Sequence, residues 1–323
     1  MRTVVCHEFA PIDRLVIEEC RDPEPGPGQV VVAVRAAGVN YVDGLFVQGK
    51  YQIKPALPFT PGGEVAGDVV AVGEGVATAS VGDRVLAMPW IGGFASHVAL
   101  PARSVVPIPG ALSYGQAAGL VQSYGTMLFS FTRRTRLETG EWVLVLGAGG
   151  GIGLAAVDVA THLGARVIAA ASSPEKLAAA TAAGAVATID YEREDLKARA
   201  RELSDGGVDV VVDPVGDRYA EPALRSLRWM GRYLVIGFAG GDIPRLPINQ
   251  VLLNNRTVVG VDWGAWTGRD PEGNQELLGQ LLELAGASVL NPVEPTAYPL
   301  DEVVRALTDL QDRKVGGKVV LVP

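Results

Sequence analysis

One segment in the middle of the chain joins an apolar strand, a glycine-rich turn and a helix without a spacer. It runs from Trp142–Leu146 through Gly147–Gly153 into Leu154–Val157. Glycines let the backbone approach a diphosphate closely, and a helix N-terminus offers unpaired N–H donors and a partial positive charge. A second apolar strand, Arg166–Ala171, closes a βαβ unit, the context in which such a turn predicts dinucleotide binding. The alternative is a glycine-rich turn in another kind of α/β protein.

From Glu141 onward, apolar strands alternate with helices. The expected strands are Trp142–Leu146, Arg166–Ala171, Val186–Ile189, Val208–Val212, Tyr233–Gly237 and Thr257–Val261. The expected helices between them are Ile152–Leu163, Pro174–Ala183, Glu192–Ser204 and Tyr219–Leu227. Strands this apolar, separated by helices, are typical of a parallel sheet covered on both faces. We therefore predict an α/β fold with a doubly wound (Rossmann) nucleotide-binding domain over residues 119–260.

The first part of the chain has a different pattern, with short strands and dense turn signals. The expected strands are Gln29–Ala36, Asp68–Val72, Arg84–Ala87, Phe94–Leu100 and Ser104–Ile108. Ser113 is expected to cap a helix near Tyr114 that continues over Ala117–Phe131. After the nucleotide-binding domain, the pattern predicts the helices Gln275–Ala285 and Leu300–Asp312 and a final strand, Lys318–Val322. We assign this strand to a mostly-β domain formed by residues 1–118 and 261–323.

The size and composition of the chain limit its class. With 323 residues, of which 48% are hydrophobic, two domains with substantial cores are expected. The net charge of −8 argues against a broad attraction to nucleic acid or anionic membranes. No signal peptide and no uninterrupted apolar run of about 18 residues is present. Because Cys6 and Cys20 are the only cysteines, a disulfide framework is not expected, and a cytoplasmic location is predicted.

The end of the second nucleotide-domain strand indicates which dinucleotide is bound. In NAD-binding domains, an acidic residue about 20 residues beyond the glycine turn binds the ribose 2′-hydroxyl. Here Ser172 and Ser173 follow the strand, and Lys176 comes shortly after them. Hydroxyl groups and an ammonium suit a 2′-phosphate, so we predict NADPH as the cofactor. Glu175 is expected to act as a helix-dipole partner, and the alternative role of Lys176 is that of a solvated surface residue.

Taken in order, these motifs resemble the medium-chain dehydrogenase/reductase superfamily and, within it, the zinc-free NADPH-dependent quinone oxidoreductases. Besides the glycine turn, the resemblance is carried by Ala37–Asp43, Pro61–Gly67, Gly82–Val85, Asp190-Tyr191 and Gly316–Val320. It covers essentially the whole chain. It implies a GroES-like, mostly-β catalytic domain together with the Rossmann domain.

The resemblance also bears on metal binding. Metal-dependent members of the superfamily carry ligands at positions that read Asn40, Gly63 and Gln122 in this chain. None of these is a good ligand for Zn²⁺, which prefers thiolate, imidazole or carboxylate. We therefore predict no metal. Without a Lewis acid, the favourable reaction is hydride delivery from NADPH to an electron-poor acceptor such as a quinone or another conjugated carbonyl compound.

The resemblance implies a set of site residues. The expected catalytic residues are Asn40, Tyr51 and Arg313. The expected cofactor-binding residues are Asn40, Thr126, Gly149, Gly150, Gly151, Ile152, Ser172, Ser173, Lys176, Tyr191, Gly237, Phe238 and Arg313. No metal-binding residue is expected.

Several of these residues have simpler alternative roles. Asn40 is then a turn residue, Thr126 a hydroxyl within a helix, Tyr51 a loop aromatic and Arg313 a solvated cation at a helix end. Asp43 is expected to be a turn or helix-start residue rather than a base, because Asp side chains often bond the nearby backbone.

The leading interpretation is a metal-independent NADPH-dependent reductase of quinones or conjugated carbonyl compounds. An enoyl-thioester (enoyl-CoA type) reductase is the alternative among enzymes. Its substrate phosphates favour a basic rim, and the only obvious basic run, Arg133–Arg136, is most simply a partner for a helix C-terminus. A crystallin-like or RNA-binding protein with a vestigial cofactor site is the alternative of another class, which the acidic charge disfavours.

The expected partners are a small-molecule electron acceptor and a second copy of the chain. In the resembled family, the strand around Thr257–Val261 often pairs with that of a symmetry mate. An apolar edge strand left uncovered is an aggregation hazard, so we predict a homodimer. Trp263 and Trp266 are candidates for lining either a substrate channel or the subunit contact. No nucleic-acid or membrane partner is expected.

Overall fold

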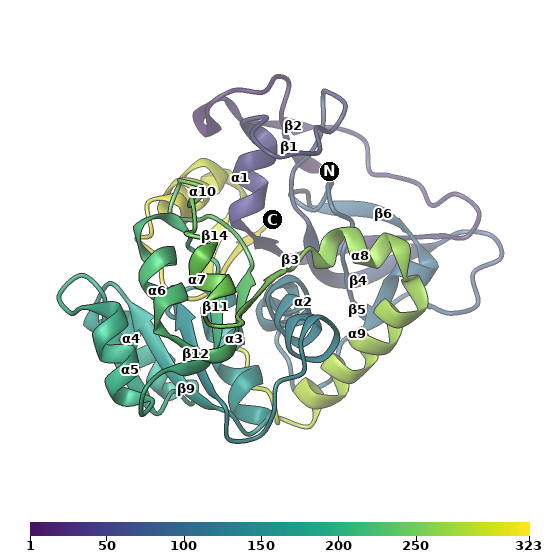
Figure 1. Cartoon of the computed structure of the whole chain (residues 1–323). Coiled ribbons are helices and arrows are strands. Elements are labelled where there is room, and N and C mark those ends of the chain that lie inside the picture. Colours follow the sequence, from purple (N-terminus) through teal and green to yellow (C-terminus); the bar gives the residue numbers. More distant parts are fainter. The chain divides into compact units, whose positions relative to one another are not determined.

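Two large sheets organise the chain, and each belongs to a different unit (Figure 1). The computed structural model describes residues 1–323. Its first unit comprises Met1–Gln122 and Pro292–Pro323, and its second unit comprises Ser123–Asn291. The second unit is therefore an insertion in the first.

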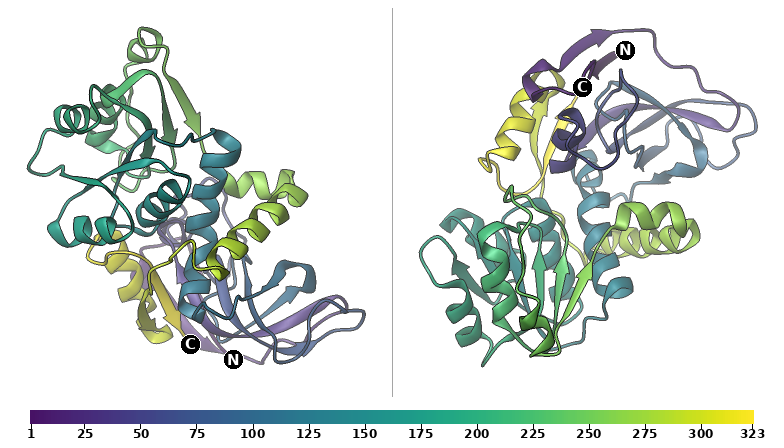
Figure 2. Two further views of the ribbon diagram at one scale, coloured as in Figure 1. Left: turned by 90° about the horizontal axis from the view of Figure 1, so that it is seen from below. Right: turned by 45° about the horizontal axis from the view of Figure 1, so that its top comes forward.

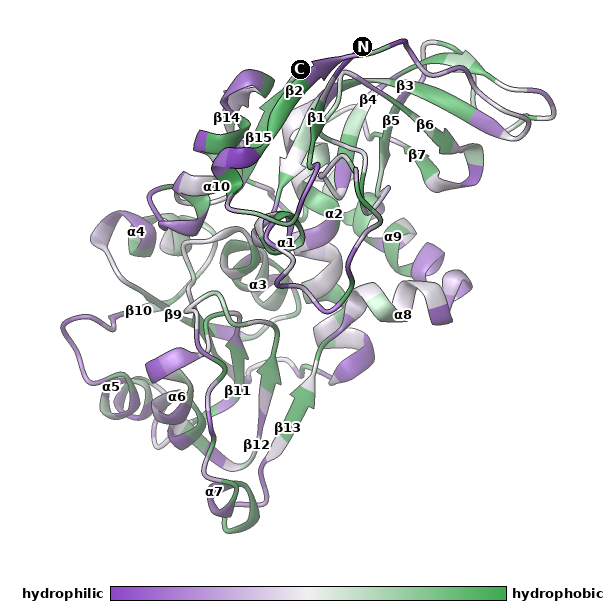
Figure 3. Cartoon of the chain, turned by 90° about the horizontal axis from the view of Figure 1, so that it is seen from above, coloured by the Kyte–Doolittle hydropathy of each residue, from purple (hydrophilic) through white to green (hydrophobic).

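The second unit contains a six-stranded sheet in the order β10-β9-β8-β11-β12-β13, in which every neighbouring pair is parallel. Its strands are β8 (Trp142–Leu146), β9 (Arg166–Ala171), β10 (Ala187–Asp190), β11 (Val208–Asp213), β12 (Leu227–Val235) and β13 (Thr257–Gly260). Figure 3 shows long hydrophobic stretches in β11 and β12. The predicted parallel sheet is confirmed, since continuous apolar runs form strands that are covered on both faces.

Helices cover both faces of this sheet (Figure 2). The helices of this unit are α3 (Gly151–His162), α4 (Pro174–Ala182), α5 (Leu196–Leu203), α6 (Ala220–Ser226), α7 (Asn249–Leu252), α8 (Trp263–Arg269) and α9 (Pro271–Gly286). Helices α3 and α4 contact each other and β9, whereas α5 and α6 contact each other. Because parallel crossovers are right-handed, the strand order places α3 and α4 on one face and α5 and α6 on the other.

Two predicted boundaries in this unit differ from the structure for a local reason. Helix α5 begins at Leu196 rather than Glu192, because Asp195 caps it and accepts a hydrogen bond from the N–H of Ala198 at 2.9 Å. Strand β12 ends before Gly237, whose N–H instead donates to the carbonyl of Asp213, at 3.3 Å. Both differences arise from side-chain caps and turns, which hydrophobic periodicity does not report.

The first unit contains a seven-stranded sheet in the order β14-β15-β3-β4-β5-β7, with β6 also paired to β3. Its strands are β3 (Gln29–Val39), β4 (Glu64–Val72), β5 (Arg84–Ala87), β6 (His97–Pro101), β7 (Val105–Pro107), β14 (Thr296–Pro299) and β15 (Val319–Val322). A separate antiparallel pair, β1 (Arg2–Val5) and β2 (Val16–Glu19), was not predicted. The predicted return of the last strand to this domain is confirmed, because β15 pairs antiparallel with β3.

Three longer helices accompany this sheet: α1 (Tyr41–Val47), α2 (Tyr114–Phe129) and α10 (Val303–Gln311). Ser113 caps α2 as predicted, since its hydroxyl accepts a hydrogen bond from the N–H of Gln116 at 3.0 Å. Helix α2 begins in the first unit and ends in the second, where a π-helical turn, Ser130–Arg134, follows it. None of the helices has both the length and the apolar character that crossing a bilayer requires.

The division between the units differs from the sequence-based one at its second boundary. We placed the return to the first domain at residue 261, whereas the second unit continues through Asn291 and so includes α8 and α9. The Trp263 ring explains this, because a Cβ on Gly125 in α2 would come within 3.0 Å of it. At the far end, the N–H of Asn291 donates to a carboxylate oxygen of Asp158 at 2.7 Å. These contacts attach the segment to the second unit.

Candidate active site

The glycine-rich turn connects β8 to α3. Gly147 has a φ of 57°, and Gly150 is the N-cap residue of α3 in an extended conformation. No side chain caps this helix, so the N–H groups of its first turn are available to an external acceptor. The turn therefore offers donors and a helix dipole to an anion.

Two glycines in the turn are required by close approach. A Cβ on Gly153 would lie 2.2 Å from the carbonyl oxygen of Gly147, so only glycine allows α3 to begin this close to the turn. A Cβ on Gly149 would lie 2.4 Å from the Cβ of Lys176. The side chain of Lys176 therefore starts directly beside the turn. The turn, with its close packing and its helix N-terminus, fits the dinucleotide predicted for it.

The segment after β9 places the other residues predicted to bind the 2′-phosphate. Ser173 is the N-cap of α4, and its hydroxyl oxygen accepts a hydrogen bond from the N–H of Lys176 at 3.4 Å. Ser172 and Lys176 are both half-buried. Glu175 lies in the first turn of α4, where hydrogen bonds from its own backbone N–H and from the Ser173 hydroxyl lower the pKa of its carboxyl. Its predicted role as a helix-dipole partner is confirmed.

The turns at the carboxyl ends of the neighbouring strands are held by Asp213, which the sequence analysis did not identify. This buried carboxylate accepts hydrogen bonds from the N–H groups of Val215 and Gly216, at 2.8 and 2.7 Å, and from the Tyr233 hydroxyl. Burial raises the pKa of Asp213. Because the carbonyl of Asp213 also accepts the N–H of Gly237, it fixes the start of the Gly237-Phe238 segment. The sequence signal that could have identified Asp213 is its position as an acidic residue at the end of an apolar strand.

Tyr191 lies at the end of β10, where its ring packs on Tyr219 with a centroid separation of 4.2 Å. Tyr219 in turn donates to Glu192, which also pairs with Arg218 at 2.7 Å. This cluster, in which Tyr219 is buried and the pair of Arg218 and Glu192 is exposed, is in the second unit, as is the glycine turn. Its position at the carboxyl edge of the sheet is compatible with the predicted contact to the adenosine phosphate.

A buried polar cluster in the first unit contains Asn40. The ammonium of Lys318 lies 2.5 Å from the side-chain oxygen of Asn40 and 2.5 Å from a carboxylate oxygen of Glu64. The Asn40 amide donates to the same Glu64 oxygen at 2.9 Å, and the N–H of Gln122 donates to the other at 3.0 Å. Glu64 is 1% exposed, so its charge depends on Lys318 for compensation. The sequence analysis quoted the motifs that contain Glu64 and Lys318 but did not identify the pair.

Asp43 belongs to the same cluster but has a structural position. Asn40 and Asp43 form a capping box at the start of α1, and the N–H of Asn40 donates to Asp43 Oδ2 at 2.7 Å. The predicted role of Asp43 as a helix-start residue is confirmed. Its other oxygen, Oδ1, is buried without a hydrogen-bond partner, and burial raises the pKa of Asp43 to about 7.

The three positions aligned with metal ligands lie close together in the first unit. A Cβ on Gly63 would be 3.8 Å from the side-chain oxygen of Gln122, and Gln122 is joined to Asn40 through Glu64. Nowhere in the chain do three or more His, Cys, Asp or Glu side chains form a group that could hold a metal ion. The groups around these positions are the side-chain amides of Asn40 and Gln122, the Glu64 carboxylate and the Lys318 ammonium.

The remaining predicted residues have the following positions. The Tyr51 ring packs on Phe46 with a centroid separation of 4.8 Å, at the edge of the first unit's core. Arg313 follows α10 with a φ of 58°, and its N–H donates to the carbonyl of Leu310. Both simpler roles, loop aromatic and helix-end cation, are compatible with these positions. Thr126 is buried within α2 and belongs to the second unit.

Comparisons with known proteins match both units. Residues 26–110 match the family described as alcohol dehydrogenase GroES-like domain, and residues 151–289 match the family described as zinc-binding dehydrogenase. The chain is 41% identical to the quinone oxidoreductase-like protein 2 homolog of Nematostella vectensis over 99% of this chain and 88% of that protein. The chain belongs to the quinone oxidoreductase family of the medium-chain dehydrogenase/reductase superfamily. The predicted resemblance and the predicted fold class are confirmed by this membership.

Solved structures of quinone oxidoreductases superimpose on the whole chain. The Thermus thermophilus quinone oxidoreductase, determined alone and in complex with NADPH, is 35% identical, with a TM-score of 0.86 and 100% of both chains covered. The Escherichia coli quinone oxidoreductase, determined in complex with NADPH, is 28% identical, with a TM-score of 0.89 and 100% of both chains covered. As a member of this family, the chain is an oxidoreductase.

Proposed function

We propose that the protein reduces a quinone or another conjugated carbonyl compound with NADPH and without a metal ion. The observation that supports NADPH most directly is the packing of Lys176 beside Gly149 in a glycine turn whose helix has no side-chain cap. The two relatives solved with NADPH support the same cofactor. In this proposal the turn and the N-terminus of α3, through Gly149, Gly150, Gly151 and Ile152, bind the diphosphate.

The other residues divide the remaining tasks. Ser172, Ser173 and Lys176 bind the 2′-phosphate, and Tyr191 packs near the adenosine. Asn40, Thr126, Gly237, Phe238 and Arg313 hold the nicotinamide half. Tyr51 donates a hydrogen bond from its phenol to the acceptor oxygen, where negative charge develops. The acceptor gains a hydride from NADPH and a proton from water, which gives a hydroquinone or a saturated carbonyl compound, and NADP⁺ is released.

The proposed independence from metal rests on the chemistry of the first-unit cluster. Amides are weak ligands for Zn²⁺, and Gly63 offers no side chain. The Lys318 ammonium, 2.5 Å from both Asn40 Oδ1 and Glu64 Oε1, already satisfies the oxygens that would face a metal and would repel a divalent cation. We therefore expect an acceptor that is electron-poor without help from a Lewis acid.

The proposal is tested by following NADPH absorbance with 1,4-benzoquinone, 9,10-phenanthrenequinone, a 2-alkenal and crotonyl-CoA as separate acceptors. We expect turnover with a quinone or the alkenal. Crotonyl-CoA reacting far faster than the others would instead identify an enoyl-thioester reductase. A protein that neither binds NADPH nor reduces any acceptor would contradict the proposal and leave a crystallin-like or RNA-binding role.

Metal independence has its own measurement. We expect the rate to stay the same after dialysis against EDTA and after addition of Zn²⁺, because the cluster around Lys318 has no set of zinc ligands. The control is the same treatment of a zinc-dependent alcohol dehydrogenase, which must lose activity in EDTA. Activity of this protein that is lost in EDTA and restored by Zn²⁺ would overturn the proposed metal-free chemistry.

We also propose that the protein forms a homodimer through β13. This strand pairs only with β12, so its other edge is open. Its Val258 is 43% exposed, and Leu252 in the neighbouring α7 is 76% exposed. An open edge with apolar side chains beside it favours pairing with the same strand of a second copy, since an isologous contact satisfies both edges at once.

A further inference from the structure

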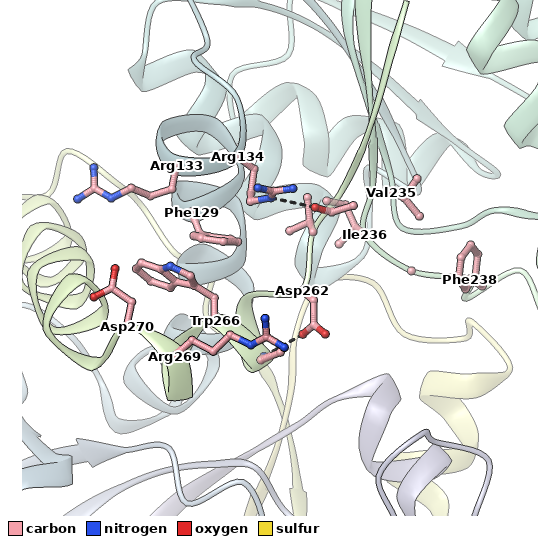
Figure 4. Close-up of a pocket in the computed structure, with 14 residues that line it drawn as sticks. Phe129, Arg133, Arg134, Val235, Ile236, Phe238, Asp262, Trp266, Arg269 and Asp270 are labelled. Atoms are coloured by element: carbon pink, nitrogen blue, oxygen red, sulfur yellow. Dashed lines mark hydrogen bonds between the residues drawn. The ribbon is translucent and has the colours of Figure 1, made fainter. Parts of the chain in front are cut away.

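An open pocket of about 720 Å³ lies in the second unit, at the carboxyl ends of β12 and β13 (Figure 4). The π-helical turn Ser130–Arg134 and helix α8 form its other sides. π-Helical turns within α-helices are rare and frequently occur at functional sites. Gly237 and Phe238, which the proposed function places at the nicotinamide, also line the pocket. The pocket is therefore adjacent to the expected point of hydride transfer.

Aromatic rings form one wall of the pocket. The rings of Phe129 and Trp266 pack with a centroid separation of 4.7 Å and an interplanar angle of 32°. Trp266 is half-buried, so part of its ring is available to a ligand. On the other side, Ile236 and Phe238 present apolar surface. Two apolar walls of this kind suit a flat, conjugated molecule.

Arginine side chains lie around the aromatic wall. Figure 4 shows Arg134 and Arg269 on opposite sides of Trp266, with Arg134 extending toward Ile236 and Arg269 toward Asp262. The Arg134 Nε donates to the carbonyl of Gly260 at 3.0 Å, which orients its guanidinium and leaves the terminal nitrogens for a ligand.

The acidic residues of the pocket act as helix caps and form no ion pair with these two arginines. Asp262 accepts the N–H of Ala265 at 2.9 Å, and Asp270 accepts the N–H of Gly273 at 3.0 Å, so each carboxylate caps a helix. Neither Arg134 nor Arg269 forms an ion pair with a carboxylate within 4.0 Å. In a chain whose net charge is −8, two arginines without an ion pair beside a half-buried indole favour an anionic ligand.

We propose that this pocket binds the anionic group of a flat, conjugated acceptor, with Arg134 and Arg269 holding a carboxylate, sulfonate or phosphate and Trp266 packing on the conjugated part. This inference rests on the proposed function, because the identity of the pocket's ligand as an acceptor depends on hydride transfer at Gly237-Phe238. Specificity would then favour acidic acceptors over neutral ones of the same shape. A free acid and a phosphate-bearing thioester share this chemistry.

The test uses a matched pair of non-reactive ligands, naphthalene-2-sulfonate and naphthalene-2-sulfonamide, titrated calorimetrically into the full chain. The two differ in charge but hardly in shape, so we expect the sulfonate to bind at least about tenfold more tightly. Arg269→Gln, whose side chain makes no ion pair in the structure, is expected to remove most of this difference without unfolding the protein. Quenching of tryptophan fluorescence by the sulfonate is expected to fall in Trp266→Phe.

The matched control is Arg136→Gln, which also removes one positive charge and lies in the basic run that contains Arg134. Arg136 does not line the pocket, is 88% exposed and pairs with Glu138 at 3.1 Å. We expect sulfonate binding to change less than about twofold in this variant, because exposed charges are strongly screened. Equal binding of the sulfonamide, or an equal loss in Arg136→Gln and Arg269→Gln, would overturn the proposal.

Two further arms separate the possible outcomes. Displacement of the sulfonate by coenzyme A supports the pocket as a site for thioester acceptors, whereas displacement only by 2-naphthoate supports it as a site for free acids. Binding of NADPH and turnover are measured in parallel. If the protein binds the sulfonate selectively but reduces no acceptor, the proposed function is refuted and the anion pocket is retained. If the protein reduces an acceptor but shows no preference for the charged ligand, the anion pocket is refuted and the proposed function is retained.

Discussion

At the scale of single residues, charge compensation in buried positions decides how the polar cluster of the first unit is held. Glu64 is contacted by one ammonium and two N–H donors, whereas Asp43 has one carboxylate oxygen without a hydrogen-bond partner. Asp43 is the group whose protonation changes near neutral pH.

The first prediction concerns Asp43 and pH. The pKa of Asp43 is raised by burial from 3.8 to about 7, so the folded state binds this proton more tightly than the unfolded state. The contribution of Asp43 to the free energy of unfolding is therefore largest below the unfolded pKa and is lost as the pH rises toward 7. The stability of Asp43→Asn relative to the unmodified protein should rise by up to about 2 kcal/mol between about pH 5 and about pH 8.

This difference is measured by urea unfolding of both proteins at the two pH values. Comparing the variant with the unmodified protein removes the titration of all other groups. Asp43→Ala, which also loses the helix cap, is expected to be destabilised at both pH values by about 1 kcal/mol relative to Asp43→Asn. A stability difference that does not depend on pH would show that Asp43 is ionised throughout.

The second prediction concerns Lys176. Because its side chain starts beside Gly149, at the turn proposed to bind the dinucleotide, Lys176→Ala should weaken NADPH binding about tenfold or more and NADH binding less than about twofold. Both dissociation constants are measured by fluorescence titration. NADH, which lacks the 2′-phosphate, is the internal control. Equal losses of affinity for the two dinucleotides would show that Lys176 does not bind the 2′-phosphate.

At the scale of secondary-structure elements, the predicted boundaries are most accurate where a continuous run of apolar residues spans a whole strand. Strands β8 and β9 begin and end at the predicted residues, since both are continuous apolar runs between turn signals. Strands β1 and β2 were missed, because each has few residues and mixed polarity. Helix α8 was missed because its sequence, rich in glycine and tryptophan, has no helical period.

The candidate site was predictable only where its residues lie close together in the sequence. Glycine turns and strand ends follow local sequence, so the sequence offered both Gly149 and Lys176 as candidates, and the structure places them side by side. The pair of Glu64 and Lys318 joins segments far apart in the sequence, and no local pattern reports such a contact. The pocket around Trp266 depends likewise on the packing of α2 against α8, which one sequence does not specify.

The third prediction tests the junction of turn and helix. Gly153→Ala would place its Cβ 2.2 Å from the Gly147 carbonyl oxygen, so α3 must shift. We expect a loss of about 1–3 kcal/mol in the free energy of unfolding and a marked loss of NADPH affinity. The matched control is Gly150→Ala, whose Cβ would lie 3.5 Å from the same oxygen at an ordinary φ of −91°. Similar losses of the two variants in urea unfolding would contradict this account of the turn. NADPH titration applies to Gly153→Ala alone, because Gly150 is itself proposed to bind the diphosphate.

At the scale of the whole molecule, the open edge of β13 determines the expected assembly. The fourth prediction is that Val258→Lys converts the dimer to a monomer, because a lysine on an edge strand opposes pairing with a second copy. Light scattering after size-exclusion chromatography measures the mass. Val16→Lys on β2 is the matched control, since Val16 is 42% exposed and Val258 is 43% exposed. A dimer that persists in Val258→Lys but not in Val16→Lys would show that the subunit interface does not involve β13.

The pairing of β15 with β3 has a consequence for how the chain is made. During synthesis, β3 leaves the ribosome long before its partner, and the entire nucleotide-binding unit is translated in between. The nascent protein therefore carries an unpaired edge in its GroES-like part until β15 has been translated. We expect this interval to be the period in which chaperones engage the chain, and loss of the last strand to leave a half-folded, aggregation-prone product.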